Sequence, residues 1–94
     1  MEELSSPLLK VDEQFRSGII YLFGSVLGDQ EAISDIDILV VYDSEEGLVE
    51  VSSSLMTLAL FAPLDIIIMS ADEERFLNFV ERQRAKPVRE VCRC

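Results

Sequence analysis

The chain has 94 residues, of which 49% are hydrophobic, and a formal net charge of −10 at pH 7 with no histidine. This length suits one small domain with one core. The absence of histidine excludes imidazole acid–base catalysis and histidine–metal chemistry. Residues 1–74 carry 16 acids and 2 bases, whereas residues 75–94 carry 2 acids and 6 bases. The acidic part would repel a nucleic-acid backbone, so direct nucleic-acid binding is disfavoured, while the basic end suits a phosphate or an acidic partner.

The apolar runs and the N-terminal residues indicate where the protein is located. No apolar run reaches the roughly 18 residues of a membrane helix, and the acidic start lacks the basic region of a signal peptide. We therefore expect a cytoplasmic protein without a membrane partner. Cys92 and Cys94 are interpreted as part of an unstructured tail, with a redox or metal pair as the alternative. We expect one domain, 1–94, in which residues 86–94 form a flexible tail or a short extended segment.

The first half of the chain predicts one helix and two strands. Ser5-Ser6-Pro7 is typical of a helix start, because serine caps helices and proline is tolerated at the first helical position. Gly18 is expected to end this helix. The apolar run 19–23 predicts a buried strand, and the run 36–42 predicts a central strand covered on both faces.

The second half predicts a helix, a strand and a further helix. A helix is expected over 45–61, ended by Pro63, and a strand over 64–69. The capping box at 70–73 opens a helix that extends to about Arg84. The side chains expected to face the core are Leu48, Val51, Leu55, Leu58 and Ala62 on the first of these helices and Phe76, Leu77, Phe79 and Val80 on the second.

This order of elements predicts an α/β (α+β) layer fold with a small mixed sheet of three to four strands packed with helices. The first two strands are expected to pair antiparallel. The second and third, which are joined through a helix, are expected to be parallel.

Three carboxylates begin two of the predicted strands. Asp35 and Asp37 are two residues apart, so on a strand both side chains point to one face and repel each other unless one is protonated or a cation lies between them. Asp65 holds the same place on the next strand. Three converging acids predict two Mg²⁺ ions, since carboxylate oxygens are the ligands this ion prefers. Two other interpretations stay open: solvated acids in a turn, and Asp65 as the cap of a neighbouring helix.

The combined pattern resembles the minimal nucleotidyltransferases of the polymerase-β superfamily. It consists of Phe23-Gly24-Ser25, a spacer of nine residues, the segment 35–41 and the segment 63–68. The resemblance covers about Val11 to Arg84 and implies the same fold. It further implies that Gly24 and Ser25 hold the triphosphate, that Asp35 and Asp37 bind the two metal ions, and that Asp65 ligates the second ion and helps to activate the acceptor hydroxyl.

Chains of this size are similar to the antitoxins of HEPN/MNT toxin–antitoxin pairs. This resemblance implies an enzyme that transfers AMP from ATP to a hydroxyl of an all-helical HEPN-type partner. One departure supports an alternative, a module of the same fold that neutralises its partner by binding alone. The usual loop Gly-Ser-x-Ala-Arg-Gly contains an arginine for phosphate charge, and the segment 24–28 has none.

Several points stay open at this stage. Arg75, Arg82 and Arg84 are candidate substitutes for the missing arginine, although the predicted helix can equally present them to solvent. An unrelated metal-binding α/β domain is a further alternative. The sequence does not decide whether the protein forms a homo-oligomer.

Overall fold

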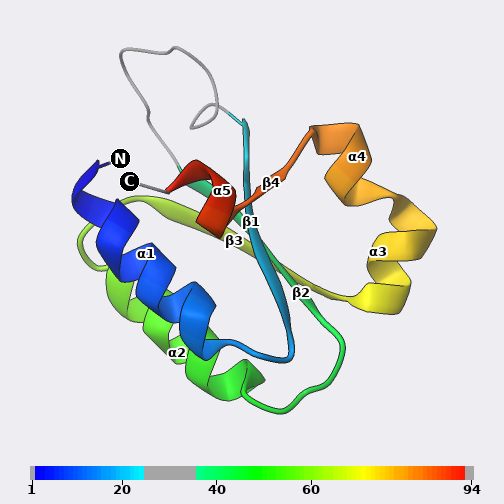
Figure 1. The fold of residues 1–94 in the computed structure, drawn as a ribbon, viewed down its shortest axis with the longest axis horizontal. Coiled ribbons are helices and arrows are strands. Elements are labelled where there is room, and N and C mark those ends of the chain that lie inside the picture. The colour runs from blue at the N-terminus through cyan, green and yellow to red at the C-terminus, as the bar shows by residue number, and fades with distance from the viewer. Residues whose placement is uncertain (1, 25–35, 93–94) are drawn as a thin grey trace.

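A computed structural model describes residues 2–24 and 36–92, and it confirms the α+β architecture (Figure 1). The elements in chain order are α1 (Glu2–Gln14), β1 (Gly18–Phe23), β2 (Ile36–Tyr42), α2 (Leu48–Leu58), β3 (Leu64–Ser70), α3 (Ala71–Leu77), α4 (Phe79–Gln83), β4 (Lys86–Pro87) and α5 (Val88–Val91). None of the described helices is long and apolar enough to span a membrane.

The strands form one mixed sheet in the order β3-β2-β1-β4. β1 pairs antiparallel with β2, and β2 pairs parallel with β3, as the sequence predicts. β4 adds a short antiparallel pairing on the other side of β1. β2 is therefore a central strand, and it buries Ile38 on one face and Leu39 on the other.

Helices cover both faces of the sheet. Figure 1 shows α1 and α2 side by side on one face, and α3 and α4 on the other. The first face holds the main core, formed by residues that include Leu8, Phe15, Ile20, Leu22, Ile36, Ile38, Val40, Val51, Leu55 and Val88. The second face holds a smaller core of Phe23, Leu39 and Met69, against which Phe79 and Val80 pack.

The ends of the first helix differ from the prediction. α1 begins at Glu2, so Pro7 lies inside the helix and does not start it. The helix ends at Gln14, and Gly18 is the first residue of β1 and not a helix stop. A Cβ at Gly18 would overlap the Val41 carbonyl oxygen and lie 2.9 Å from the Phe15 ring. The glycine is therefore explained by close packing against the β2 backbone and the Phe15 ring, which helix-end signals do not detect.

The second helix is shorter than predicted. α2 begins after Gly47, which has a left-handed backbone (φ 77°), and ends at Leu58. Val51 and Leu55 are buried as expected, and Leu48 and Leu58 pack partly against the same core. The expected last member of the stripe, Ala62, lies beyond the helix.

The last predicted helix is two helices. Asn78 adopts a left-handed backbone (φ 53°), and its N–H donates to the Glu74 carbonyl at 2.6 Å, which ends α3. The break changes the direction of every later side chain. Phe79 and Val80, which follow the break, pack on the second core as predicted. Phe76 precedes the break and is 89% exposed, so the expectation that it faces the core is wrong. Leu77 is also exposed, contrary to the same expectation.

The C-terminal residues are packed up to Cys92. Val88 and Cys92 are buried in the main core, so the interpretation of Cys92 as part of an unstructured tail is wrong. Arg89 Nε donates to Oδ2 of the buried Asp12 at 3.1 Å, which joins α5 to α1 across 77 positions of sequence. Cys94 lies outside the described residues.

Candidate active site

Two of the predicted carboxylates lie next to each other at one edge of the sheet. Asp37 and Asp65 are Cα partners in the parallel ladder between β2 and β3, each the second residue of its strand. Neighbouring strands are about 4.8 Å apart. Both side chains point to the face that holds the smaller core, because they alternate with residues of the main core. Asp37 is half-buried and Asp65 is exposed.

The starts of the two strands are held together by a further bond. The Ile36 N–H donates to the Pro63 carbonyl at 2.9 Å, one step before the aligned pair of acids. The spacing of the carboxylates is therefore fixed by backbone pairing and does not depend on contacts between the side chains.

Gly24, which follows β1, lies against the Asp37 carboxylate. Its backbone is left-handed (φ 78°), a conformation that glycine adopts without strain. The preceding residue, Phe23, is the Cα partner of Asp37. A Cβ at Gly24 would overlap Asp37 Oδ2 and lie 3.2 Å from its Cγ. Only glycine fits both the backbone conformation and the space beside this acid.

Two of the candidate site residues, Ser25 and Asp35, lie outside the described residues. Within residues 2–24 and 36–92 no group of three or more acidic or cysteine side chains is arranged to hold a metal ion. The described part of the site therefore consists of Gly24, Asp37 and Asp65.

This donor set fits a hard divalent cation. Two carboxylates on one face of adjacent strands repel each other, and a cation between them relieves the repulsion. Their oxygens are the ligands that Mg²⁺ takes, and the absence of a side chain at Gly24 leaves the space that the Asp37 carboxylate occupies. Asp37 and Asp65 are thus the described residues that would hold such an ion.

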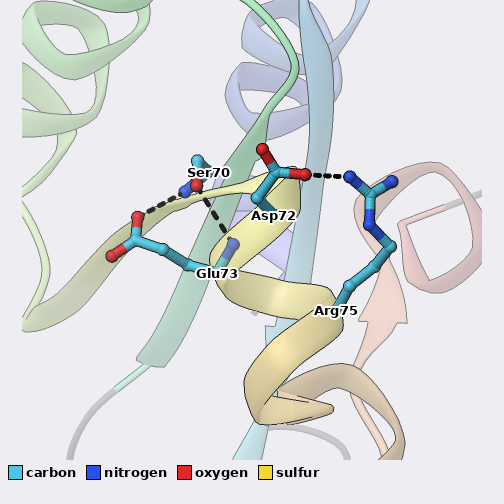
Figure 2. A network of polar contacts seen from close by, with 4 residues as sticks. All are labelled: Ser70, Asp72, Glu73 and Arg75. Carbon is cyan, nitrogen blue, oxygen red and sulfur yellow. Dashed lines mark hydrogen bonds and ion pairs between the residues drawn. The ribbon is translucent and has the colours of Figure 1, made fainter.

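The interpretation of Asp65 as a helix cap finds no support among the described helix starts. The N-cap residues of α2, α3, α4 and α5 are Gly47, Ser70, Asn78 and Pro87. Ser70 caps α3 through a reciprocal pair of bonds with Glu73 (Figure 2). Asp65 lies at the opposite end of the strand that leads into this helix.

Arg75 pairs with an acid of its own helix. Its guanidinium pairs with Asp72 in the first turn of α3, as Figure 2 shows. α3 follows the last residue of β3, and the five steps from Asp65 to Ser70 span about 17 Å of strand. This ion pair occupies the Arg75 guanidinium, and the expectation that Arg75 could replace the missing loop arginine stays a prediction.

The basic C-terminal segment lies beside the end of β1 that leads into Gly24. Lys86 is the Cα partner of Leu22, and Arg84 comes two residues before Lys86. The Phe79 ring of α4 meets Phe23 edge-on, with the ring centroids 5.1 Å apart. Lys86 was not singled out from the sequence, because the pairing of β4 with β1 joins residues far apart in the chain.

Comparison with known proteins agrees with this geometry. The family model described as polymerase beta, nucleotidyltransferase, matches residues 10–86. A crystal structure described provisionally as a nucleotidyltransferase is similar in fold, with a TM-score of 0.51 and 22% identity over 93% of this chain and 95% of that one. No curated protein matches the chain. Since the family model covers most of the sequence, including Gly24, Asp37 and Asp65, the chain belongs to the polymerase beta nucleotidyltransferase family.

Proposed function

We propose that this protein is a Mg²⁺-dependent nucleotidyltransferase that transfers AMP from ATP to a hydroxyl of a protein partner. The observation that supports the proposal is the aligned pair Asp37 and Asp65, with Gly24 closed against Asp37. Membership of the nucleotidyltransferase family supports the transferase class. The resemblance to HEPN/MNT antitoxins is the reason for proposing AMP and an all-helical HEPN-type acceptor.

The carboxylates have the role of metal ligands in this proposal. Asp35, Asp37 and Asp65 hold two Mg²⁺ ions, which neutralise the triphosphate charge and lower the pKa of the acceptor hydroxyl. Because the protein mainly positions groups in phosphoryl transfer, a small site on one sheet edge is sufficient.

The phosphate side of the site uses residues from two segments. In this proposal Gly24 and Ser25 would hold the triphosphate, as the resemblance implies, and a side chain at position 24 would displace the Asp37 carboxylate. Arg84 supplies positive charge from the segment beside β1, in place of the loop arginine that this chain lacks. This compensates the strongly acidic character of residues 1–74, which on its own would repel ATP.

The test has a binding part and an activity part. Binding of Mn²⁺ to the purified protein is measured first, comparing wild type with Asp37→Asn and Asp65→Asn. Asp43→Asn is the matched control, because Asp43 is an exposed acid just beyond the other end of β2. We expect both site variants to weaken Mn²⁺ binding at least tenfold, which corresponds to about 1.4 kcal/mol, and the control to bind as wild type does.

The activity part uses ATP labelled in its α-phosphate, Mg²⁺ and a HEPN-type protein. Wild type should label the HEPN-type protein, whereas Asp37→Asn should not. If wild type and Asp37→Asn leave this protein equally unlabelled, the proposed transfer is wrong.

A second candidate function is neutralisation of the partner by binding alone. The segment 24–28, which lacks the usual arginine, favours it. This function predicts that Asp37→Asn and Asp65→Asn still form the complex and still silence the partner. Loss of silencing with the complex intact would reject binding alone and favour transfer.

A further inference from the structure

β3 is an edge strand with no described strand on its outer side. The sheet order places it at one end, and within the described residues β2 is its only partner in the sheet. Its sequence, Leu64-Asp65-Ile66-Ile67-Ile68-Met69-Ser70, contains neither the lysine nor the proline that commonly protects an edge from pairing. Such an edge offers a row of backbone donors and acceptors to another strand.

One flank of α2 is apolar and exposed. Val49, Met56 and Leu60 are 75%, 66% and 80% exposed. At about 100° per residue, positions 49, 56 and 60 lie within about 40° of one another around the helix axis, with Leu60 in the turn that follows α2. The only charged residue of α2, Glu50, lines the cavity between α2 and α1 and so lies on a different side of the helix.

The apolar flank and the open edge are neighbours. α2 connects the parallel strands β2 and β3 and packs on the face where Leu64 and Ile66 join the main core. Ile68, which is 42% exposed, lies two residues beyond Ile66 on the strand and therefore points to the same face. α1 occupies the opposite flank of α2. We call the outer edge of β3 together with Val49, Met56, Leu60 and Ile68 the β3–α2 surface.

We propose that the β3–α2 surface binds the same surface of a second copy of this chain. A two-fold axis perpendicular to the sheet pairs β3 antiparallel with its copy, extends the sheet across both molecules and keeps their faces aligned. The apolar flank of one α2 then lies against that of the other. With Ile67 on the axis, Ile66 faces Ile68 and Asp65 faces Met69, so no acid lies opposite another.

Charge favours a second copy over a basic partner. A chain with net charge −10 can associate with itself only through a surface that keeps acids apart. The β3–α2 surface has this property, since Asp65 is its only charged residue. A basic protein would be expected to bind where acids are concentrated, and nothing on this surface supplies such a concentration.

The proposed dimer is independent of the proposed catalytic function. The side chains of Asp37 and Asp65 point to the face opposite α2, so joining the two α2 flanks does not require either carboxylate to bind a metal ion. The substitutions that test the dimer lie on α2 and in the turn that follows it, away from the site.

Sedimentation velocity of the full chain tests the proposal at concentrations from about 5 to 500 µM, a range that brackets the micromolar affinity of a modest interface. Wild type should shift from monomer to dimer across this range. Met56→Lys and Leu60→Lys should each weaken the dimer at least tenfold. Phe76→Lys is the matched control, because Phe76 is also a highly exposed apolar residue but lies on α3, on the other side of the sheet. It should associate as wild type does.

Amide hydrogen exchange supplies a second readout. Amides of residues 64–70 should exchange more slowly at high protein concentration than at low concentration, and this difference should disappear in Met56→Lys. A wild-type chain that stays monomeric throughout would overturn the proposal. A dimer that survives both lysine substitutions, or that leaves the exchange of residues 64–70 unchanged, would place the interface elsewhere and overturn it equally.

Discussion

Replacing Gly24 by alanine tests the link between the glycine turn and the carboxylate site. Gly24 and Gly47 both have left-handed backbones, with φ of 78° and 77°, but a Cβ at Gly47 would meet nothing within 4 Å. At Gly24 the same atom would overlap Asp37 Oδ2. Gly47→Ala is therefore a control that carries the backbone strain without the clash.

The expected losses of thermal stability and of Mn²⁺ affinity follow from the backbone strain and from the clash with Asp37. Strain in the left-handed region costs about 1–2 kcal/mol, which lowers the melting temperature of a domain of this size by roughly 5–15 °C. Both variants should show a loss of this order. Gly24→Ala should in addition displace the Asp37 carboxylate and weaken Mn²⁺ binding about tenfold or more, since about 1.4 kcal/mol is lost when one charged ligand is misplaced.

Circular dichroism melting and Mn²⁺ titration are the measurements. Gly47→Ala should melt lower than wild type and bind Mn²⁺ with unchanged affinity. Equal Mn²⁺ affinities for Gly24→Ala, Gly47→Ala and wild type would refute the reasoning, because the ion would then not depend on the position of Asp37. A wild type that binds no Mn²⁺ would instead refute the metal site itself.

Three further predictions concern an ion pair, a residue with a left-handed backbone and a tyrosine. Arg89→Ala removes the ion-pair partner of Asp12, and Asp12 is only 2% exposed. The free energy of unfolding in urea should fall by about 1–3 kcal/mol, a cost that is reduced because Arg89 is largely exposed. An unchanged unfolding midpoint would contradict this. Arg84→Gly should raise the melting temperature, because it relieves a left-handed backbone (φ 54°) worth about 1 kcal/mol, and should also weaken ATP binding; unaltered ATP affinity would remove Arg84 from the phosphate site. Burial, and to a lesser extent the Glu74 carboxylate, raises the pKa of Tyr21 above 10.0. The protonated phenol therefore contributes stability that is fully present below about pH 10 and is lost as the pH rises through the folded-state pKa, so Tyr21→Phe should lose less stability than wild type above pH 10 in denaturation experiments.

The strands and the first pairings were predictable because their signals are local. β1 and β2 are apolar runs, and Gly24 and Pro63 mark where β1 ends and β3 begins. A helical crossover implies parallel strands, and parallel strands with acids at the same position imply adjacent carboxylates. The register that aligns Asp37 with Asp65 thus agrees with an expectation drawn from the order of elements. The roles of these residues in metal binding and catalysis remain predictions.

The features that the sequence did not predict depend on distant contacts. Gly18 carries a glycine because Val41 and Phe15 approach it, and Asp12 is buried because Arg89 reaches it from the last helix. Asn78 interrupts a helical pattern that its neighbours support, since asparagine tolerates the left-handed conformation and the Glu74 carboxylate then accepts from the Val80 N–H at 3.0 Å. No periodicity within a single segment contains this information.

The short pairing of β4 with β1 bears most directly on function. A nucleotide site in an acidic chain needs a local source of positive charge, and the segment 24–28 does not contain one. The edge-on contact of Phe79 with Phe23 holds α4 over the end of β1, and β4 then runs along the same strand. Residues 84–86 are thereby brought beside the end of β1 from the opposite end of the sequence. If this segment compensates for the missing arginine, Arg84→Ala should weaken ATP binding several-fold more than Lys10→Ala, because Lys10 lies on α1 on the other face of the sheet. Equal effects of the two substitutions would show that only net charge matters, and the catalytic proposal would then lack its phosphate-binding cation.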